Sequence, residues 1–194
     1  MTGGASGPTV GVFGELDSLI VPDHPLSDPE THAVHACGHH SQIGSLLTVA
    51  IGLRAAGVLE SLAGRVALLA VPAEEFIEIE YRDELRRAGK LEFLGGKPEF
   101  VKLGAMDDVD VAMMTHTENQ DWGYAGCKIG VGAQNNGMVA KRIKFNGVAS
   151  HAGGSPHLGV NALNAANIAL MAIHAQRETF RDEDSIRIHP IITR

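Results

Sequence analysis

The first part of the chain holds three short apolar runs separated by longer segments. Residues 9–14, 65–71 and 109–114 are mostly apolar, which is typical of short strands buried on both faces of a sheet. Between the first two runs, residues 41–59 place apolar side chains at helical spacing, and Gly57 marks the end of that pattern. This predicts a helix. Strand and helix alternating over connections of this length predict an α/β fold with a parallel sheet.

The remaining segments are less regular. Residues 20–40 contain three prolines and five of the ten histidines and are predicted to be a loop. The charged stretch 76–104 has a helical pattern at 81–88 and is predicted to be a helical insertion over the surface.

The pattern of apolar and polar residues changes after Trp122. Residues 137–145 alternate in polarity, a helical pattern follows from 160 to about 180, and residues 186–193 resemble a strand. We therefore predict a β-α-β unit in a second layer. This divides the chain into two domains, residues 1–125 and residues 126–194.

Composition narrows the classes of protein that fit. The chain has 194 residues, 44% of them hydrophobic, with a net charge of -7 and no basic stripe, which argues against nucleic acid as a partner. Its longest strongly apolar run, residues 66–71, is too short to cross a bilayer. Residues 1–8 lack the basic and apolar parts of a signal peptide. We expect a cytoplasmic protein without a membrane partner.

The strongest local chemical signal is the sequence HACGHH at residues 35–40. It places the Cys37 thiol beside one to three imidazoles, a combination suited to zinc. Gly38 has no Cβ, so the backbone can bend and direct the Cys37 and His39 side chains to one centre. The alternative is a solvated histidine-rich loop with a buried free cysteine. A disulfide with Cys127 is disfavoured because nothing in the pattern resembles a disulfide framework.

Acidic and imidazole side chains follow the predicted strands. Glu74 and Glu75 come directly after a strand and Pro72, and ligands in open α/β sheets gather at the carboxyl ends of strands. One carboxylate can bind a metal while the other acts as general base. Alone, such a pair is more often a solvated surface. His116 after the third strand would complete a four-ligand shell, and Asp17 after the first could accept the far N–H of a ligating imidazole.

These motifs together resemble the aminoacylase and carboxypeptidase group of dinuclear metallohydrolases, peptidase family M-twenty. The resemblance rests on ELDSL at 15–19, HACGHH at 35–40, PAEE at 72–75, His116, and GVASHAGGSPHLGVNAL at 147–163. Within the group, the Cys-Gly-His form is similar to the amidohydrolase branch. The resemblance implies a phosphorylase/hydrolase-like catalytic domain at 1–125 and part of an inserted α+β lid and dimerisation domain at 126–194.

The resemblance also implies residue roles. It implies four metal ligands, Cys37, His39, Glu75 and His116, and catalytic roles for Glu74, His151 and Asp17. Glu74 would take a proton from a metal-activated water and return it to the leaving amine, and His151 would stabilise the oxyanion in a partner subunit's site. The cofactor would be a divalent metal, two per site, with zinc favoured and manganese or cobalt as alternatives.

The implied substrate is an N-acyl amino acid or a small dipeptide, hydrolysed at its amide bond by a homodimer joined through the lid domain. Asn135, Asn136 and Arg177 are candidates for contact with a substrate carboxylate. Relatives usually have Asp or Asn where this chain has His40, and often Asp or His at Glu15. They also carry a further ligating histidine near the C-terminus and a longer N-terminal segment, so the chain resembles a piece of a longer protein.

Two alternatives remain at this stage. The chain could be a non-catalytic metal-binding or dimerising remnant of such an enzyme. It could also be an α/β domain with a structural zinc held by Cys37, His39 and His116, while Glu74 and Glu75 lie in solvent.

Overall fold

The computed structural model describes residues 1–117, 129–132 and 137–193. These residues fall into two compact units, Met1–Gly130 and Val131–Arg194. The predicted boundary between residues 125 and 126 lies outside the described residues.

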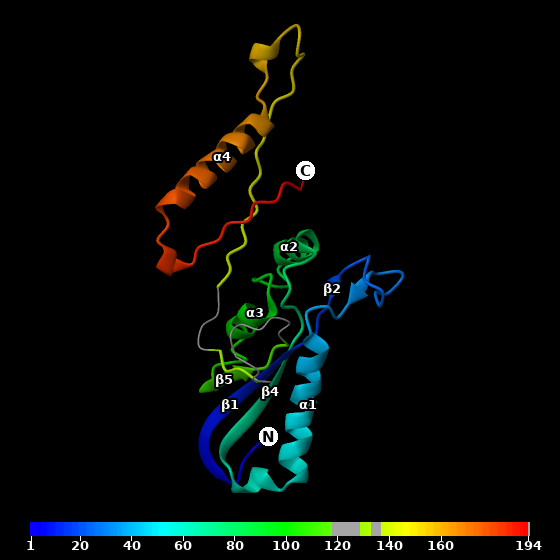
Figure 1. Cartoon of the computed structure of the whole chain (residues 1–194), viewed down its shortest axis with the longest axis vertical. Helices are drawn as coiled ribbons and strands as arrows, with labels where there is room; N and C mark the ends of the chain where they lie inside the picture. The colour runs from blue at the N-terminus through cyan, green and yellow to red at the C-terminus, as the bar shows by residue number, and fades with distance from the viewer. Residues whose placement is uncertain (118–128, 133–136, 194) are drawn as a thin grey trace. The chain divides into compact units, whose positions relative to one another are not determined.

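The first unit is built on a three-stranded sheet (Figure 1). The strands β1 (Ala5–Glu15), β4 (Ala63–Val71) and β5 (Val111–Met114) confirm the three predicted strands. The order is β4-β1-β5, and β1 pairs in parallel with both neighbours. The predicted parallel α/β sheet is therefore confirmed, and the carboxyl ends of all three strands lie at one edge.

The helix α1 (His39–Ala55) packs closely on β1 and confirms the predicted helix, with its start two residues earlier. A Cβ at Gly14 would lie 3.0 Å from Ile43 Cδ1, so the small residue permits the close approach. Leu46 of α1 is buried. The helix therefore holds its N-terminus at the carboxyl edge of the sheet.

Shorter elements surround this framework. The predicted loop contains a small antiparallel pair, β2 (Leu19–Ile20) and β3 (Ala33–Val34). A turn of 3-10 helix (Val58–Ser61) precedes β4. The helices α2 (Ile79–Arg87) and α3 (Gly96–Lys102) confirm the predicted helical insertion. Among the described residues, no helix is both long and apolar enough to span a membrane.

Gly96 fixes the start of α3 against the end of β4. Its backbone N–H donates to Ala73 O at 2.6 Å. A Cβ at this position would lie 2.8 Å from both that oxygen and Val71 Cγ1. The contact leaves no room for a side chain and holds the next residue, Lys97, at the edge of the sheet.

The second unit is built around α4 (Ala162–Gln176), which confirms the core of the predicted helix. Three short 3-10 helices accompany it: Pro156–Leu158, Arg177–Thr179 and Asp182–Asp184. The predicted strands at 137–145 and 186–193 are wrong for the described residues. A strand needs a neighbour to accept and donate its backbone hydrogen bonds, and the bridge in this unit is a single pair, Val148 with Val160. The described residues therefore do not form the predicted β-α-β unit.

Candidate metal centre

His39 lies in the middle of the candidate centre. It is the first residue of α1 and only 1% exposed. Its Nδ1 lies 2.9 Å from the backbone oxygen of Asp17 and 3.2 Å from Asp17 Oδ1. Because a carbonyl oxygen can only accept, Nδ1 donates its proton here, and in a neutral imidazole Nε2 then keeps its lone pair. Nε2 is therefore the ring atom available as a ligand.

Three carboxylates face His39 Nε2 from the ends of β1 and β4. Glu15 Oε2 lies 3.0 Å away, Glu74 Oε2 3.8 Å and Glu75 Oε1 3.9 Å. The Glu74 side chain is 39% exposed and the Glu75 side chain 19%. Of the two adjacent carboxylates, Glu74 is thus the more open to solvent.

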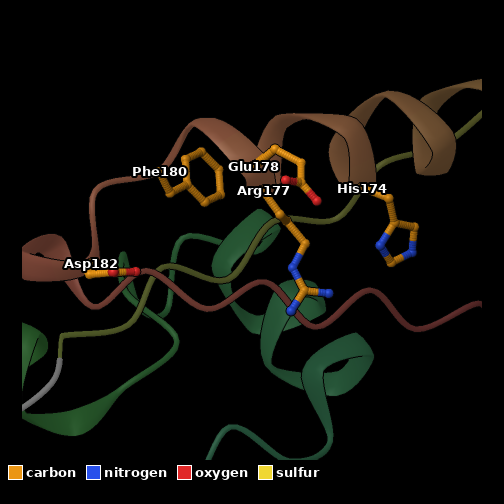
Figure 2. A pocket seen from close by; sticks show the side chains of 5 residues that line it. All are labelled: His174, Arg177, Glu178, Phe180 and Asp182. Carbon is orange, nitrogen blue, oxygen red and sulfur yellow. The ribbon is translucent and has the colours of Figure 1, made fainter.

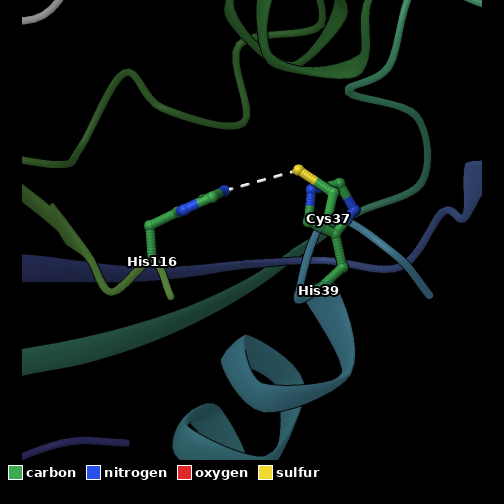
Figure 3. Close-up of side chains that lie close together, drawn as sticks. All are labelled: Cys37, His39 and His116. Atoms are coloured by element: carbon green, nitrogen blue, oxygen red, sulfur yellow. Dashed lines mark hydrogen bonds between the residues drawn. The ribbon is translucent and has the colours of Figure 1, made fainter. Parts of the chain in front are cut away.

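Cys37 and His116 complete the group from the loop before α1 and the segment after β5. Cys37 Sγ lies 3.6 Å from His116 Nε2 (Figure 3). His116 Nδ1 lies 2.7 Å from Thr117 O, so in a neutral ring its Nε2 also keeps the lone pair. The ligand atoms of Cys37, His39 and His116 all lie within 4.8 Å of one another. The structure thus brings together the four residues predicted as metal ligands.

Asp17 contacts both His39 and the turn that carries Glu74 and Glu75. Its Oδ2 accepts hydrogen bonds from the backbone N–H groups of Glu74 at 2.8 Å and Glu75 at 2.9 Å. Its other oxygen and its carbonyl face His39 Nδ1. Asp17 therefore contacts the imidazole through its carbonyl and the turn that carries the two glutamates through its side chain.

The backbone at Gly38 lets the Cys-Gly-His segment bend. Its φ is 91°, in the left-handed region, and a Cβ there would collide with Thr117 Oγ1. By contrast, His35 and His40 are exposed, with ring centroids 5.7 Å apart. The solvated-loop interpretation fits these two histidines and not His39.

Burial, together with the neighbouring acidic groups, shifts two pKa values in the centre. Partial burial, followed by the hydrogen bond and charge of Glu75, raises the pKa of the Cys37 thiol to about 12. Burial raises the pKa of Glu74, the charge of Glu15 adds to this, and Lys97 acts in the opposite direction. The centre therefore disfavours further negative charge, and a divalent cation would reverse that preference.

The residues present fit a divalent cation. His39 Nε2 and Glu75 Oε1 are buried and have no hydrogen-bond partner within the described residues, an arrangement that costs free energy unless something else satisfies them. Sulfur, imidazole nitrogen and carboxylate oxygen are donors that zinc accepts, while the carboxylates also suit manganese and cobalt.

The sequence interpretation missed Lys97. Its Nζ forms an ion pair with Glu15 Oε1, and Glu15 is itself only 1% exposed. The two residues are 82 positions apart, and only the packing of α3 against β4 brings them together. The glycine pair before Lys97 was the available signal, since it permits close backbone approach.

His151 lies in the second unit, where it is exposed. Its Nδ1 accepts hydrogen bonds from the backbone N–H groups of Gly153 at 3.1 Å and Gly154 at 2.7 Å. The neutral ring therefore carries its proton on Nε2 and presents a donor.

The residues suggested for contact with a substrate carboxylate are less informative. Asn135 and Asn136 lie outside the described residues. Arg177 lines a shallow hollow at the end of α4 (Figure 2). The other residues around this hollow are His174, Glu178, Phe180 and Asp182. No residue predicted for catalysis or metal binding lines it.

Comparison with known proteins agrees with the resemblance. The peptidase dimerisation domain matches residues 133–188. The chain is 34% identical over 167 residues to Xaa-Arg dipeptidase of Mus musculus, covering 81% of this chain and 31% of that protein. It is 32% identical over 187 residues to indole-3-acetyl-aspartic acid hydrolase of Enterobacter agglomerans, covering 89% and 37%. It is 26% identical over 196 residues to one of the subunits of p-aminobenzoyl-glutamate hydrolase of Escherichia coli, covering 98% and 35%. No solved structure matches.

A parallel α/β unit with a sulfur, nitrogen and carboxylate cluster at its strand ends is the kind of scaffold on which metal-dependent hydrolases are built. The matches make this assignment specific: the chain belongs to peptidase family M-twenty. It spans about a third of the length of the curated relatives that it matches.

Proposed function

We propose that this chain is part of a metal-dependent amidohydrolase that cleaves the amide bond of an N-acyl amino acid or a small dipeptide. The observation that carries the proposal is the convergence of buried, unpartnered His39 Nε2 and Glu75 Oε1 with Cys37 and His116 at one edge of the sheet. The names of the relatives, a dipeptidase and two hydrolases of amino-acid conjugates, support the substrate class.

Four residues would hold the metal: Cys37, His39, Glu75 and His116. When bound, a divalent metal supplies Lewis acidity, which polarises the amide carbonyl and makes water a stronger nucleophile at neutral pH. Two ions per site, with zinc as the first choice, fit the number and mixture of donors. Asp17 keeps the His39 proton on Nδ1 and so leaves Nε2 free for the ion.

Glu74 is the general base in this scheme. Its carboxylate lies beside His39 and is more exposed than that of Glu75, so it can reach a water and a substrate. A raised pKa makes the carboxylate a stronger base. Glu74 takes a proton from the attacking water and passes it to the nitrogen of the leaving amine.

His151 and the second unit would act in a homodimer. The His151 Nε2–H, fixed by the two backbone donors at Nδ1, suits the stabilisation of negative charge on the carbonyl oxygen. We assign residues 126–194 to part of a lid and dimerisation domain on the basis of the match at 133–188, and residues 1–125 to the metal-binding catalytic domain.

The proposal is tested first by counting metal. Wild type and Cys37→Ala are purified side by side, loaded with zinc or manganese, dialysed and analysed for metal per chain. We expect one or two ions in wild type and a loss in the variant. No metal in either would overturn the proposal.

The second test separates metal binding from chemistry. Glu74→Gln should keep its metal, but the rate at which it releases amine from N-acyl amino acids and dipeptides should fall at least 100-fold. General-base catalysis typically raises a reaction rate by a factor of about 10² to 10⁴. The reference is the unmodified protein under the same conditions. Full activity in Glu74→Gln would show that the base is another residue.

A structural zinc is the alternative that the tight group of Cys37, His39 and His116 favours. In that case Glu75→Ala would leave zinc affinity unchanged. The amidohydrolase proposal instead requires Glu75→Ala to weaken it.

A further inference from the structure

The connection from β4 to α3, residues 74–95, leaves the sheet and returns to it at one point. Ala73 precedes this connection, and its carbonyl oxygen accepts a hydrogen bond from the backbone N–H of Gly96 at 2.6 Å. The two ends of the connection therefore meet at the carboxyl edge of the sheet. Its first two residues are Glu74 and Glu75, and its last is Gly95.

The returning end lies against the candidate centre. Lys97 comes two residues after Gly95, and its Nζ is paired with Glu15. The other carboxylate oxygen of Glu15 lies 3.0 Å from His39 Nε2. Because the connection begins and ends beside the centre, the side chains at its two ends border a substrate bound there.

Phe76 joins the two ends of the connection. It follows Glu75 directly, and its ring lies against the backbone of Gly95. A Cβ built on Gly95 would be 3.5 Å from both Cε2 and Cζ of the ring, a distance at which apolar atoms are in contact. Because Gly95 has no side chain, it supports the ring without covering it.

The Phe76 ring is also open to solvent near the proposed general base. Phe76 is 38% exposed, and the Glu74 side chain is 39% exposed. Consecutive Cα atoms lie about 3.8 Å apart, so the Cα atoms of these two residues lie within about 8 Å of each other. An apolar surface and a reactive carboxylate are therefore accessible within the length of one small substrate.

A ring in this position suits a flat apolar group on the substrate. The substrates proposed above carry a group on each side of the scissile amide, only a few covalent bonds from the carbonyl carbon. Aromatic rings attract each other beyond the apolar area that they bury. Binding sites for small molecules combine apolar walls with a few polar groups. Phe76 supplies such a wall beside the polar groups of the centre.

We propose that Phe76 is a specificity-determining residue, against which an aromatic group of the substrate packs while the scissile amide lies at Glu74. The inference rests on the proposed function, because it requires a substrate at the centre. It adds to that function a chemical feature of the substrate, an aromatic group next to the scissile bond, and the residue that selects it.

The test measures binding and uses the full 194-residue chain, loaded with zinc and carrying Glu74→Gln so that the probes are not consumed. The probes are N-acetylalanine, N-benzoylalanine and N-acetylphenylalanine. The second adds a ring on the acyl side of the amide and the third adds one on the amine side. Dissociation constants come from NMR titration. With Phe76 intact, at least one aromatic probe should bind about fivefold or more tightly than N-acetylalanine, as expected for one aromatic contact.

Two replacements of Phe76 separate the aromatic face from simple packing. Phe76→Ala should abolish the preference for the aromatic probe and change the affinity for N-acetylalanine less than about twofold. Phe76→Leu keeps an apolar side chain against Gly95 but removes the ring, so it should lower the preference at least twofold. Zinc content and circular dichroism check that each variant is folded, and Phe76→Leu decides the question if Phe76→Ala is not.

Phe93→Ala is the matched control. Phe93 is 43% exposed and belongs to the same connection. Its backbone N–H binds Glu99, and the preceding Glu92 pairs with Lys102. These contacts place Phe93 beside the C-terminal half of α3, away from the end that meets β4. Its replacement should leave all three dissociation constants unchanged.

An undiminished aromatic preference in folded Phe76→Ala or Phe76→Leu would overturn the inference. So would a zinc-loaded chain with Phe76 intact that binds none of the probes or does not favour an aromatic one. In these cases the proposed function still stands on its zinc content and on the amine released by the chain without Glu74→Gln. If the unmodified chain binds no zinc, the proposed function fails, and this inference fails with it.

Discussion

Asp17 contacts more of the candidate centre than its position after β1 suggests. It accepts two backbone hydrogen bonds from the turn after β4 and faces the Nδ1–H of His39. We predict that Asp17→Asn weakens zinc binding about 10- to 100-fold. The amide has one acceptor oxygen, so its NH₂ group must face either the two backbone N–H groups or the imidazole N–H.

Zinc affinity is measured by competition with a chromogenic chelator. Asp28→Asn is the control. Asp28 accepts a similar set of hydrogen bonds in the turn at Thr31, away from the centre, and should leave zinc affinity unchanged. Equal affinities for Asp17→Asn and wild type would mean that the Asp17 carboxylate does not help to orient the centre.

Gly38 gives a second prediction at the scale of one residue. Gly38→Ala should lower the free energy of unfolding by about 1 to 3 kcal/mol more than Gly57→Ala. Both glycines have positive φ, 91° and 63°, but a Cβ at Gly57 meets nothing within 4 Å while one at Gly38 strikes Thr117. The comparison isolates the clash from the backbone strain. Urea unfolding of the two variants measures the difference, and equal losses would contradict it.

Residue types and their order were enough to predict part of the centre. Glu75 and His116 follow strands, Cys37 precedes α1 and His39 begins it. Parallel strands bring such ends to one edge. The contact of Lys97 with Glu15 was not predictable, because it depends on how α3 packs against β4. The resemblance supplied the role of His151, which as a single loop histidine carries no signal of its own.

At the scale of elements, the apolar runs of β1, β4 and β5 were enough to predict strands. The structure pairs each of these runs with a neighbouring strand in the sheet. The alternation at 137–145 and 186–193 did not lead to strands. Alternation reports which side chains could share a face, whereas a strand also requires a neighbouring backbone at about 4.8 Å. A pattern within one segment says nothing about that neighbour. The order β4-β1-β5 was unpredictable for the same reason.

The helix α4 offers a test of local stability. Asn161 is its N-cap, and its side chain accepts from the backbone N–H groups of Leu163 at 2.9 Å and Asn164 at 3.3 Å. Asn161→Ala should destabilise α4 by about 1 kcal/mol. The same substitution at Asn167, which lies inside the helix, should stabilise it by a few tenths of a kcal/mol, about the difference in helix propensity. Amide hydrogen exchange of α4 measures both, and effects of the same sign would contradict the capping role.

At the scale of the whole molecule, α4 carries large apolar side chains that the described residues leave uncovered. Leu163 is 58% exposed, Ile168 68% and Met171 71%. Apolar side chains at helical spacing that face water mark a contact surface. The match of residues 133–188 to a peptidase dimerisation domain supports a second copy of the chain as the partner for this surface.

We therefore predict that the protein dimerises and that Ile168→Glu raises the dimer dissociation constant at least tenfold, because a buried apolar contact would be replaced by an unpaired charge. Gln176→Glu is the matched control: it adds the same charge to the same helix, at a polar, exposed position on a different face, and should raise the constant less than about threefold. Sedimentation velocity over a range of concentrations distinguishes the variants. A wild type that stays monomeric at all concentrations would rule out self-association of this chain. Equal dissociation constants for Ile168→Glu and wild type would instead place the interface away from Ile168.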